Sequence, residues 1–332
     1  MRLLAVVVLL GLLAVASPVS AAATGEGIVV AVLDSGVDGT HDELSGRVES
    51  LSFQAVVPGI PLNPNAALAD PNGQGTAVAS LIAGSSLGLA PQARILDLQV
   101  SAQYSGTTLD PAAEQSAIAA MDYLLTNPDR VQVAILSFAS RGVSASGAQT
   151  LAQQADGLRD AGILVIVPSG PTMSRLHGDA SVLTVAGTDC PSGAKQGSAD
   201  HARKPDLVAE HAGLEAATPA TLTGPGSTRA VTGSAFAAAQ VAGTAALMLD
   251  ARDGLPADAA AALLRDTAAD VGEPGIDACN GFGLVVPEAA VAAAIGWVDP
   301  LETYPTKPTP GLAGPTLALL VGALALAARR RA

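Results

Sequence analysis

Aromatic residues are scarce in this chain of 332 residues, where Phe, Trp and Tyr together make up 2%. A core must therefore be built from aliphatic side chains, and hydrophobic residues make up 49% of the sequence. Charged residues are also few, at 14%, and this combination excludes an intrinsically disordered chain. Basic residues are the rarer charge, with 17 Lys and Arg against 30 Asp and Glu. The chain thus lacks the basic surface of a nucleic-acid-binding protein, and we predict no nucleic-acid partner.

The first 22 residues are typical of a secretory signal peptide. A basic start, Met1-Arg2, precedes an uncharged apolar run over 3–16, and small residues follow at Val19-Ser20-Ala21. Signal peptides combine these three features in this order. We therefore predict that residues 1–22 are a signal peptide and that the chain is exported, with a buried N-terminal helix as the alternative.

The C-terminal segment is typical of a membrane anchor. Residues 312–328 are uncharged and mainly apolar, and three arginines at 329–331 close the run. Such a run is long enough to span a bilayer, and the arginines favour the cytoplasmic side. We predict a transmembrane helix over 312–331 with an arginine-rich cytoplasmic end. An internal core helix and a sorting tail that is removed after export are the alternatives.

Between these ends, residues 25–296 form the predicted extracytoplasmic domain, and residues 297–311 form a proline-rich stalk that lifts it off the cell membrane. This body is more acidic than the whole chain, because the two ends hold four arginines and no acidic residue. An exported, single-pass membrane protein is the topology that these segments predict together.

Cysteine and histidine are too few for common metal sites. The two cysteines, Cys190 and Cys279, cannot supply four zinc ligands, and the 4 histidines are scattered. We predict no metal and no cofactor. In an exported chain an even pair of cysteines favours a disulfide, with two buried free thiols as the alternative.

Short apolar runs alternate with helical patterns along the body, which predicts an α/β fold: a parallel sheet with helices on both faces, in a single domain. Functional residues in such sheets lie at the carboxyl ends of the strands. The predicted strands cover residues 28–33, 95–100, 131–137, 163–167 and 182–186. The predicted helices cover residues 75–84, 110–125, 147–161, 235–250, 256–268 and 287–295.

Three motifs together resemble the subtilases, the subtilisin-like serine proteases. They are Val30-Ala31-Val32-Leu33-Asp34-Ser35-Gly36-Val37-Asp38, Gly73-Gln74-Gly75-Thr76 and Gly233-Ser234-Ala235-Phe236-Ala237-Ala238. The resemblance implies a subtilisin-like fold. It also implies that Asp34 stands at the place of the triad aspartate, Gln74 at that of the catalytic histidine and Ala235 at that of the nucleophilic serine. By the same resemblance Pro171 replaces the oxyanion asparagine. The signal peptide, stalk and membrane span also resemble the mycosins, the membrane-anchored subtilases of type VII secretion.

These replacements predict a catalytically degenerate site. Alanine has no heteroatom that could attack a carbonyl, and a glutamine amide does not accept a proton near neutral pH. In subtilisin itself, which is the reference case for such losses, removal of the serine or the histidine alone lowers kcat roughly 10⁶-fold. We expect Gln74 to donate its amide to Asp34, so that the carboxylate keeps a structural role.

Other residues could take over the chemistry only by relocation. Ser234 would align with the nucleophile after a slip of one residue, but the slip breaks the match that follows it. His41 is expected to tie down the loop after Asp34, and the remaining histidines, His177, His201 and His211, are expected to be solvated.

A binding surface could remain where catalysis is lost. Leu136-Ser137-Phe138-Ala139 resembles the strand of the family whose edge pairs with extended substrate, and an open edge can capture a peptide without cutting it. We therefore predict a pseudoprotease that binds a polypeptide or stabilises an envelope or secretion assembly, with Ser137, Phe138 and Ala139 as the peptide-binding residues. An active serine endopeptidase with non-standard residues and a purely structural domain are the alternatives.

Overall fold

A parallel sheet of seven strands forms the centre of the computed structural model, which describes residues 23–53, 70–100, 111–140, 143–170, 174–189 and 204–299. Each neighbouring pair of strands is parallel. This confirms the predicted α/β class. Across the sheet the order is β2 (Val48–Ser52), β3 (Arg94–Gln99), β1 (Val29–Asp34), β4 (Val133–Leu136), β5 (Leu164–Pro168), β6 (Val182–Gly187) and β7 (Leu207–Ala209).

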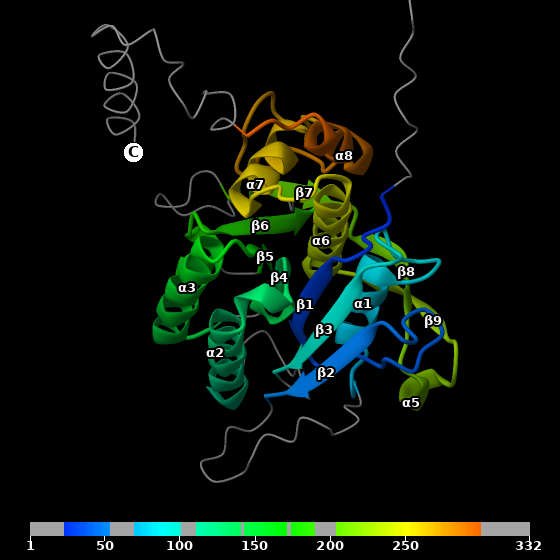
Figure 1. The fold of residues 1–332 in the computed structure, drawn as a ribbon. Coiled ribbons are helices and arrows are strands. Elements are labelled where there is room, and N and C mark those ends of the chain that lie inside the picture. Colours follow the sequence, from blue (N-terminus) through cyan, green and yellow to red (C-terminus); the bar gives the residue numbers. More distant parts are fainter. Residues whose placement is uncertain are drawn as a thin grey trace, which may run out of the picture. The chain divides into compact units, whose positions relative to one another are not determined.

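Helices cover both faces of this sheet (Figure 1). One face packs against α2 (Pro111–Thr126) and α3 (Ala145–Asp160). The other face packs against α1 (Gln74–Ala83) and α6 (Ser234–Ala251), which contact each other. The remaining described helices are η1 (Pro128–Arg130), η2 (Ser137–Ser140), α4 (Arg175–Gly178), α5 (Ala220–Thr223), α7 (Ala257–Asp266) and α8 (Pro287–Ile295).

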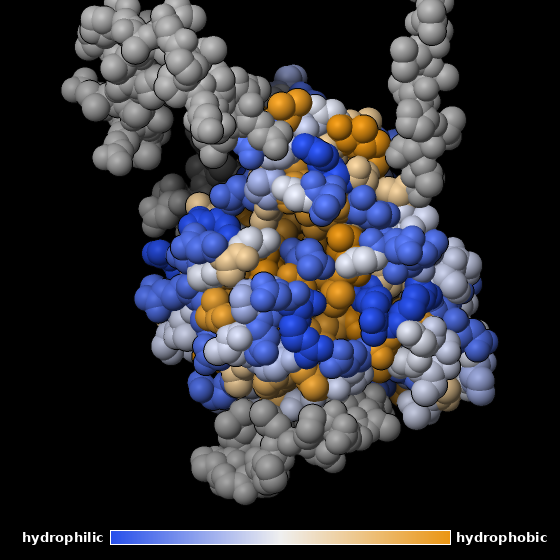
Figure 2. All heavy atoms as spheres, viewed as in Figure 1, coloured by the Kyte–Doolittle hydropathy of each residue, from blue (hydrophilic) through white to orange (hydrophobic). Residues whose placement is uncertain are grey.

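The core is aliphatic, as the scarcity of aromatic residues requires. The central strands β1, β4 and β5 are buried along almost their whole length, because helices lie over both of their faces. On the face of the molecule that Figure 2 shows, hydrophilic residues lie beside smaller apolar areas. The largest fully buried side chain is Phe138, directly after β4.

An antiparallel hairpin of β8 (Ala212–Ala217) and β9 (Thr228–Thr232) lies outside the main sheet. The sequence analysis did not predict this hairpin, because many of its residues are small or polar and form no continuous apolar run. Most residues of β9 are exposed. The hairpin packs against α1, where the Ala217 amide donates to the Ser80 hydroxyl at 3.0 Å. It therefore braces the helix that carries Gln74.

The start of the domain is fixed by one carboxylate. Oδ2 of Asp250, near the end of α6, accepts the backbone amides of Thr24 and Gly25 at 2.7 and 2.8 Å. The Thr24 carbonyl in turn accepts the amide of Gln92 at 2.9 Å. These contacts join the first described residues to the central helix.

Among the described residues, α6 is the one helix that is long and apolar enough to cross a membrane, and 67% of it is buried inside the domain. Its apolar character is therefore that of a core helix. The predicted signal peptide (1–22) and transmembrane helix (312–331) lie outside the described residues, as does nearly all of the predicted stalk (297–311).

Candidate functional site

Asp34 is the last residue of β1, and its side chain is completely buried. The Ser35 amide donates to its Oδ1 at 2.6 Å, and the Ser137 hydroxyl also hydrogen-bonds to the carboxylate. Burial raises the pKa of Asp34 from 3.8 to about 6, while the bond from Ser137 lowers it and the charge of Asp70 raises it further. Asp34 thus lies at a strand carboxyl end, where the fold class predicts functional residues.

Gln74 is the first residue of α1, and its amide nitrogen points to the same place. Nε2 lies 3.5 Å from Oδ2 of Asp34 and 3.2 Å from Oγ of Ser137. The predicted donation to Asp34 is confirmed, although at the long limit of a hydrogen bond. The sequence analysis missed that Ser137, which directly follows the neighbouring strand β4, bonds to both residues and joins them.

Two glycines allow α1 to begin so close to Asp34. Gly73, directly before the helix, has φ 77°, a left-handed conformation that glycine adopts without strain. At Gly75 a Cβ atom would lie 2.1 Å from the Gly36 carbonyl oxygen, so the loop after β1 packs directly on the helix backbone. This contact holds Gln74 next to the end of β1.

Asp70 organises the loop that leads into α1. Its Oδ1 accepts from the Ser35 hydroxyl at 2.7 Å and from the Gly73 amide at 2.9 Å, and its Oδ2 accepts from the Thr76 amide at 2.9 Å. Amides of the first helical turn need such acceptors because they have no partner within the helix. The sequence analysis did not identify this role of Asp70.

A third buried carboxyl group, Asp97 on β3, lies close enough to interact with the other two. Burial raises its pKa well above 3.8, while bonds from Ser50 and the Val37 amide lower it and the charges of Asp70 and Asp34 raise it. The Val37 amide donates to Oδ2 at 3.1 Å, whereas buried Oδ1 has no partner among the described residues. Asp97 also escaped the sequence analysis, although an acid within an apolar strand was a visible signal.

Ala235, which the sequence analysis matches to the serine position, is the second residue of α6 and is buried. Its neighbour Ser234, the alternative nucleophile, donates its hydroxyl to the Ser169 carbonyl at 2.6 Å. That bond occupies the Ser234 proton and anchors the start of α6 to the segment after β5. Pro171, the predicted oxyanion replacement, lies outside the described residues.

The described histidines bond elsewhere. His41 is buried between the Ser227 carbonyl, at 3.0 Å from Nε2, and the Glu43 amide, at 3.2 Å from Nδ1, and so ties down its loop as predicted. The expectation that His177 and His211 are solvated is wrong, because both are buried. Nε2 of His211 lies 2.8 Å from the Asp189 carboxylate. His201 lies outside the described residues.

Among the described residues, His177 is the one histidine whose ring contacts a serine hydroxyl, that of Ser174. This contact resembles the histidine–serine pair of a serine protease. Its Nδ1 lies 2.8 Å from Oγ of Ser174 and 3.0 Å from the Ser174 amide. This geometry is the capping box of α4, in which the two residues satisfy the end of the helix. The Ser174–His177 contact therefore has a structural explanation, away from β1.

The segment predicted to bind peptide differs from the expectation. Ser137–Ser140 is the short helix η2, and the side chains of Ser137 and Phe138 are completely buried. Ser137 bonds within the site, and Phe138 is a core residue, so neither side chain is available to a ligand. The side chain of Ala139 lies outside the described part of the chain.

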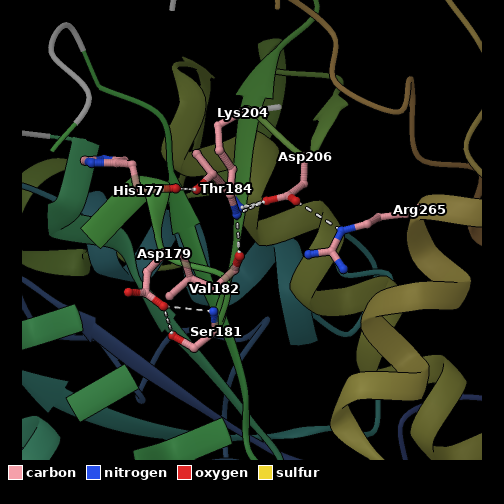
Figure 3. Close-up of polar contacts among 8 residues, drawn as sticks. All are labelled: His177, Asp179, Ser181, Val182, Thr184, Lys204, Asp206 and Arg265. Carbon is pink, nitrogen blue, oxygen red and sulfur yellow. Dashed lines mark hydrogen bonds and ion pairs between the residues drawn. The ribbon is translucent and has the colours of Figure 1, made fainter. Parts of the chain in front are cut away.

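Charges are also buried away from the site, where β6, β7 and α7 meet (Figure 3). Nζ of Lys204 lies 2.5 Å from Oδ2 of Asp206, and Nε of Arg265 lies 3.0 Å from Oδ1 of the same carboxylate. Burial lowers the pKa of Lys204, and the charge of Asp206 opposes this change. The contacts join strand ends to α7, which is a structural role.

Among the described residues, no three His, Cys, Asp or Glu side chains are grouped so that they could hold a metal ion. Cys279 is disulfide-bonded. The sequence has one further cysteine, Cys190, which lies outside the described residues.

Two curated proteins similar to this chain are proteases. It is 27% identical over 240 residues to an extracellular serine proteinase of Thermus sp. strain Rt41A, an alignment that covers 68% of this chain and 52% of that protein. It is 34% identical over 103 residues to the subtilisin-like protease PopC of Myxococcus xanthus, covering 30% of this chain and 21% of PopC. The chain thus spans about half the length, or less, of these relatives.

The fold also has a solved counterpart. Fervidolysin from Fervidobacterium pennivorans, a keratinolytic enzyme related to subtilisin, superposes with a TM-score of 0.61 at 23% identity, covering 81% of this chain and 43% of fervidolysin. A family model described as the subtilase family, Peptidase_S8, matches residues 25–283. With the order of the strands and the place of Asp34 at the end of β1, this match shows that the chain belongs to the subtilase family.

Proposed function

We propose that this subtilase is a pseudoprotease that binds a polypeptide, or stabilises an envelope assembly, on the outer side of the cell membrane. The observation that carries the proposal is the Asp34–Gln74 contact, in which an amide occupies the place where a base would stand. A glutamine amide can hold the carboxylate in place but cannot take a proton from a nucleophile. Ala235 supplies no nucleophile to activate.

Nearby hydroxyls do not replace the missing serine. Ser35 bonds to Asp70, Ser137 to Asp34 and Gln74, and Ser234 to a backbone carbonyl. None of the three hydroxyls has a described imidazole as partner. Since an unactivated hydroxyl is a weak nucleophile, these contacts favour a non-catalytic role over proteolysis.

A fluorophosphonate probe tests the loss of catalysis. The purified full-length protein, kept in detergent, is incubated with the probe, and covalent labelling is measured by mass spectrometry beside an active subtilisin. We expect no labelled serine. Labelling that disappears in Ser234→Ala or Ser174→Ala would identify a relocated nucleophile and reject the pseudoprotease.

Binding of unfolded polypeptide separates the binder from a passive scaffold. We expect the protein to bind members of a mixed pool of synthetic decapeptides saturably and to leave them uncut. If the protein binds no peptide of the pool and cuts none, a purely structural domain is favoured instead.

The membrane tether and the likeness to mycosins belong to the same proposal. A signal peptide, stalk and terminal span would hold the acidic domain at the outer surface, where an envelope or secretion complex could recruit it. The sequence pattern of residues 297–331 supports this arrangement.

A further inference from the structure

The two ends of the Gln74 amide meet different surroundings. Nε2 faces Oδ2 of Asp34 and Oγ of Ser137. An ionised carboxylate only accepts hydrogen bonds, and the Ser137 hydroxyl already directs its one proton to Asp34. Both neighbours therefore require a donor from Gln74. This requirement fixes the amide with its NH₂ group inward and its oxygen, Oε1, in the opposite direction.

Oε1 of Gln74 has no hydrogen-bond partner within the described part of the chain, and it is not among the enclosed polar atoms that lack a partner. The side chain is half-buried and stands at the first position of α1. The oxygen is thus an accessible acceptor, held by a bonded amide, at the edge of the sheet where β1 ends.

We propose that Gln74 Oε1 is a fixed hydrogen-bond acceptor that binds a backbone N–H group of an extended polypeptide, with Asp34 and Ser137 as positioning residues that hold the amide in this orientation. The inference rests on the proposed polypeptide binding and names the atom that accepts a hydrogen bond from the ligand. It also explains why a buried carboxylate is retained without catalysis, because Asp34 binds the NH₂ group of Gln74 and so turns the oxygen toward the ligand.

The alternative is that Gln74 only fills space and satisfies Asp34. In that case the inward donor matters and the outward oxygen does not. Replacement of Gln74 by methionine removes both ends but keeps the length of the side chain. A ligand-side change is therefore needed to isolate the oxygen, and a peptide with one backbone N–H methylated supplies it.

The experiment starts from a decapeptide that the full-length wild-type protein retains from the pool. Each backbone N–H of that peptide is methylated in turn, and affinity is measured by calorimetry for wild type, Gln74→Met and the control Gln92→Met, whose side chain is exposed. We expect one methylated position to weaken binding to wild type and to Gln92→Met about 3–10-fold, the effect of one hydrogen bond. The same methylation should leave the already weakened binding to Gln74→Met unchanged.

Asp34→Asn tests the positioning role. Asparagine can donate to Gln74 Oε1 and so release the amide from its single orientation. We expect this variant to lose the sensitivity to the methylated position. Unaltered sensitivity would show that Asp34 does not orient the amide.

A spectroscopic readout covers the case in which a variant does not fold. In wild type labelled with ¹³C and ¹⁵N, the retained peptide should shift the side-chain carbonyl resonance of Gln74 and leave that of Gln92 in place. Peptide binding without a shift at Gln74, or with equal affinity for Gln74→Met, would overturn the inference while polypeptide binding stands. Retention of no peptide would overturn both.

Discussion

At the residue scale, Asp34 is held by contacts that have a structural role of their own. It accepts the Ser35 amide at 2.6 Å, bonds to Ser137 and lies 3.5 Å from the Gln74 amide. A buried carboxylate that lost these partners would cost several kcal/mol, of order 3–5, which is a reason to keep them whatever the reaction. Retention of the aspartate therefore does not require proteolysis.

The raised pKa of Asp34 predicts how stability depends on pH. Between its ordinary pKa of 3.8 and the folded value of about 6, the folded state holds the proton more tightly than the unfolded state. Stability from this group is therefore full below pH 3.8 and is lost as pH rises through 6, by roughly 3 kcal/mol. Urea unfolding of wild type and Asp34→Asn at pH 4.5 and 7.5 measures it. Relative to Asp34→Asn, we expect wild type to have a lower free energy of unfolding at pH 7.5 than at pH 4.5.

Asp97 changes with pH in the same direction and is present in both proteins, so the comparison cancels most of its effect. A stability difference between wild type and Asp34→Asn that is identical at both pH values would contradict the raised pKa of Asp34.

Reconstruction of the triad is a second prediction at this scale. Gln74→His supplies a base beside Asp34 and Ala235→Ser restores the nucleophile that the resemblance implies, but Pro171 offers no side-chain donor to an oxyanion. We expect hydrolysis of a fluorogenic peptide by this double variant to stay about 10²–10³-fold below that of a triple variant that also carries Pro171→Asn. Equal rates would mean that backbone amides alone complete the oxyanion site.

The sequence predicted part of this site. Asp34, Gln74 and Ala235 lie in local motifs, so their positions could be matched one by one. The role of Asp70 could not be predicted in this way, because it depends on Ser35, which is 35 positions away in the sequence. Ser137 was named for a different role, because its contact with Gln74 spans 63 positions. Phe138 was misjudged because a pattern does not show that the chain turns into η2 directly after β4.

At the scale of elements, the alternation of apolar runs predicted the central strands and the long helices within a few residues. Edge strand β2 and the β8–β9 hairpin were missed, because half-exposed strands contain polar residues and lack a continuous apolar run. The elements that surround the site were thus predicted better than those at the margins.

The contact between Asp250 and the start of the domain gives a prediction at this scale. Asp250→Ala leaves the Thr24 and Gly25 amides without their acceptor, and we expect a loss of about 1–3 kcal/mol in the free energy of unfolding. Hydrogen exchange at these two amides should accelerate in parallel. Asp253→Ala, which removes an exposed acid nearby, is the matched control. Equal stability of the two variants would show that the contact contributes nothing.

At the scale of the whole molecule, an acidic, aliphatic domain is predicted to stand on a terminal membrane span. Deletion of residues 312–332 should release the protein into the medium, whereas the full chain should require detergent for extraction. Cell fractionation and immunoblotting measure the distribution. A shortened chain found in the medium after expression of the full sequence would instead indicate a C-terminal tail that is removed after export.

The burial of α6 has a consequence for how such a protein can arise. The helix packs within the domain, and its second residue, Ala235, has a methyl group at the position that the sequence analysis matches to the reactive hydroxyl of the family. Burying a methyl needs no partner, whereas a buried hydroxyl does. Under the proposed function, loss of the reaction at this point therefore costs the architecture little, and the scaffold can acquire a different task without being rebuilt.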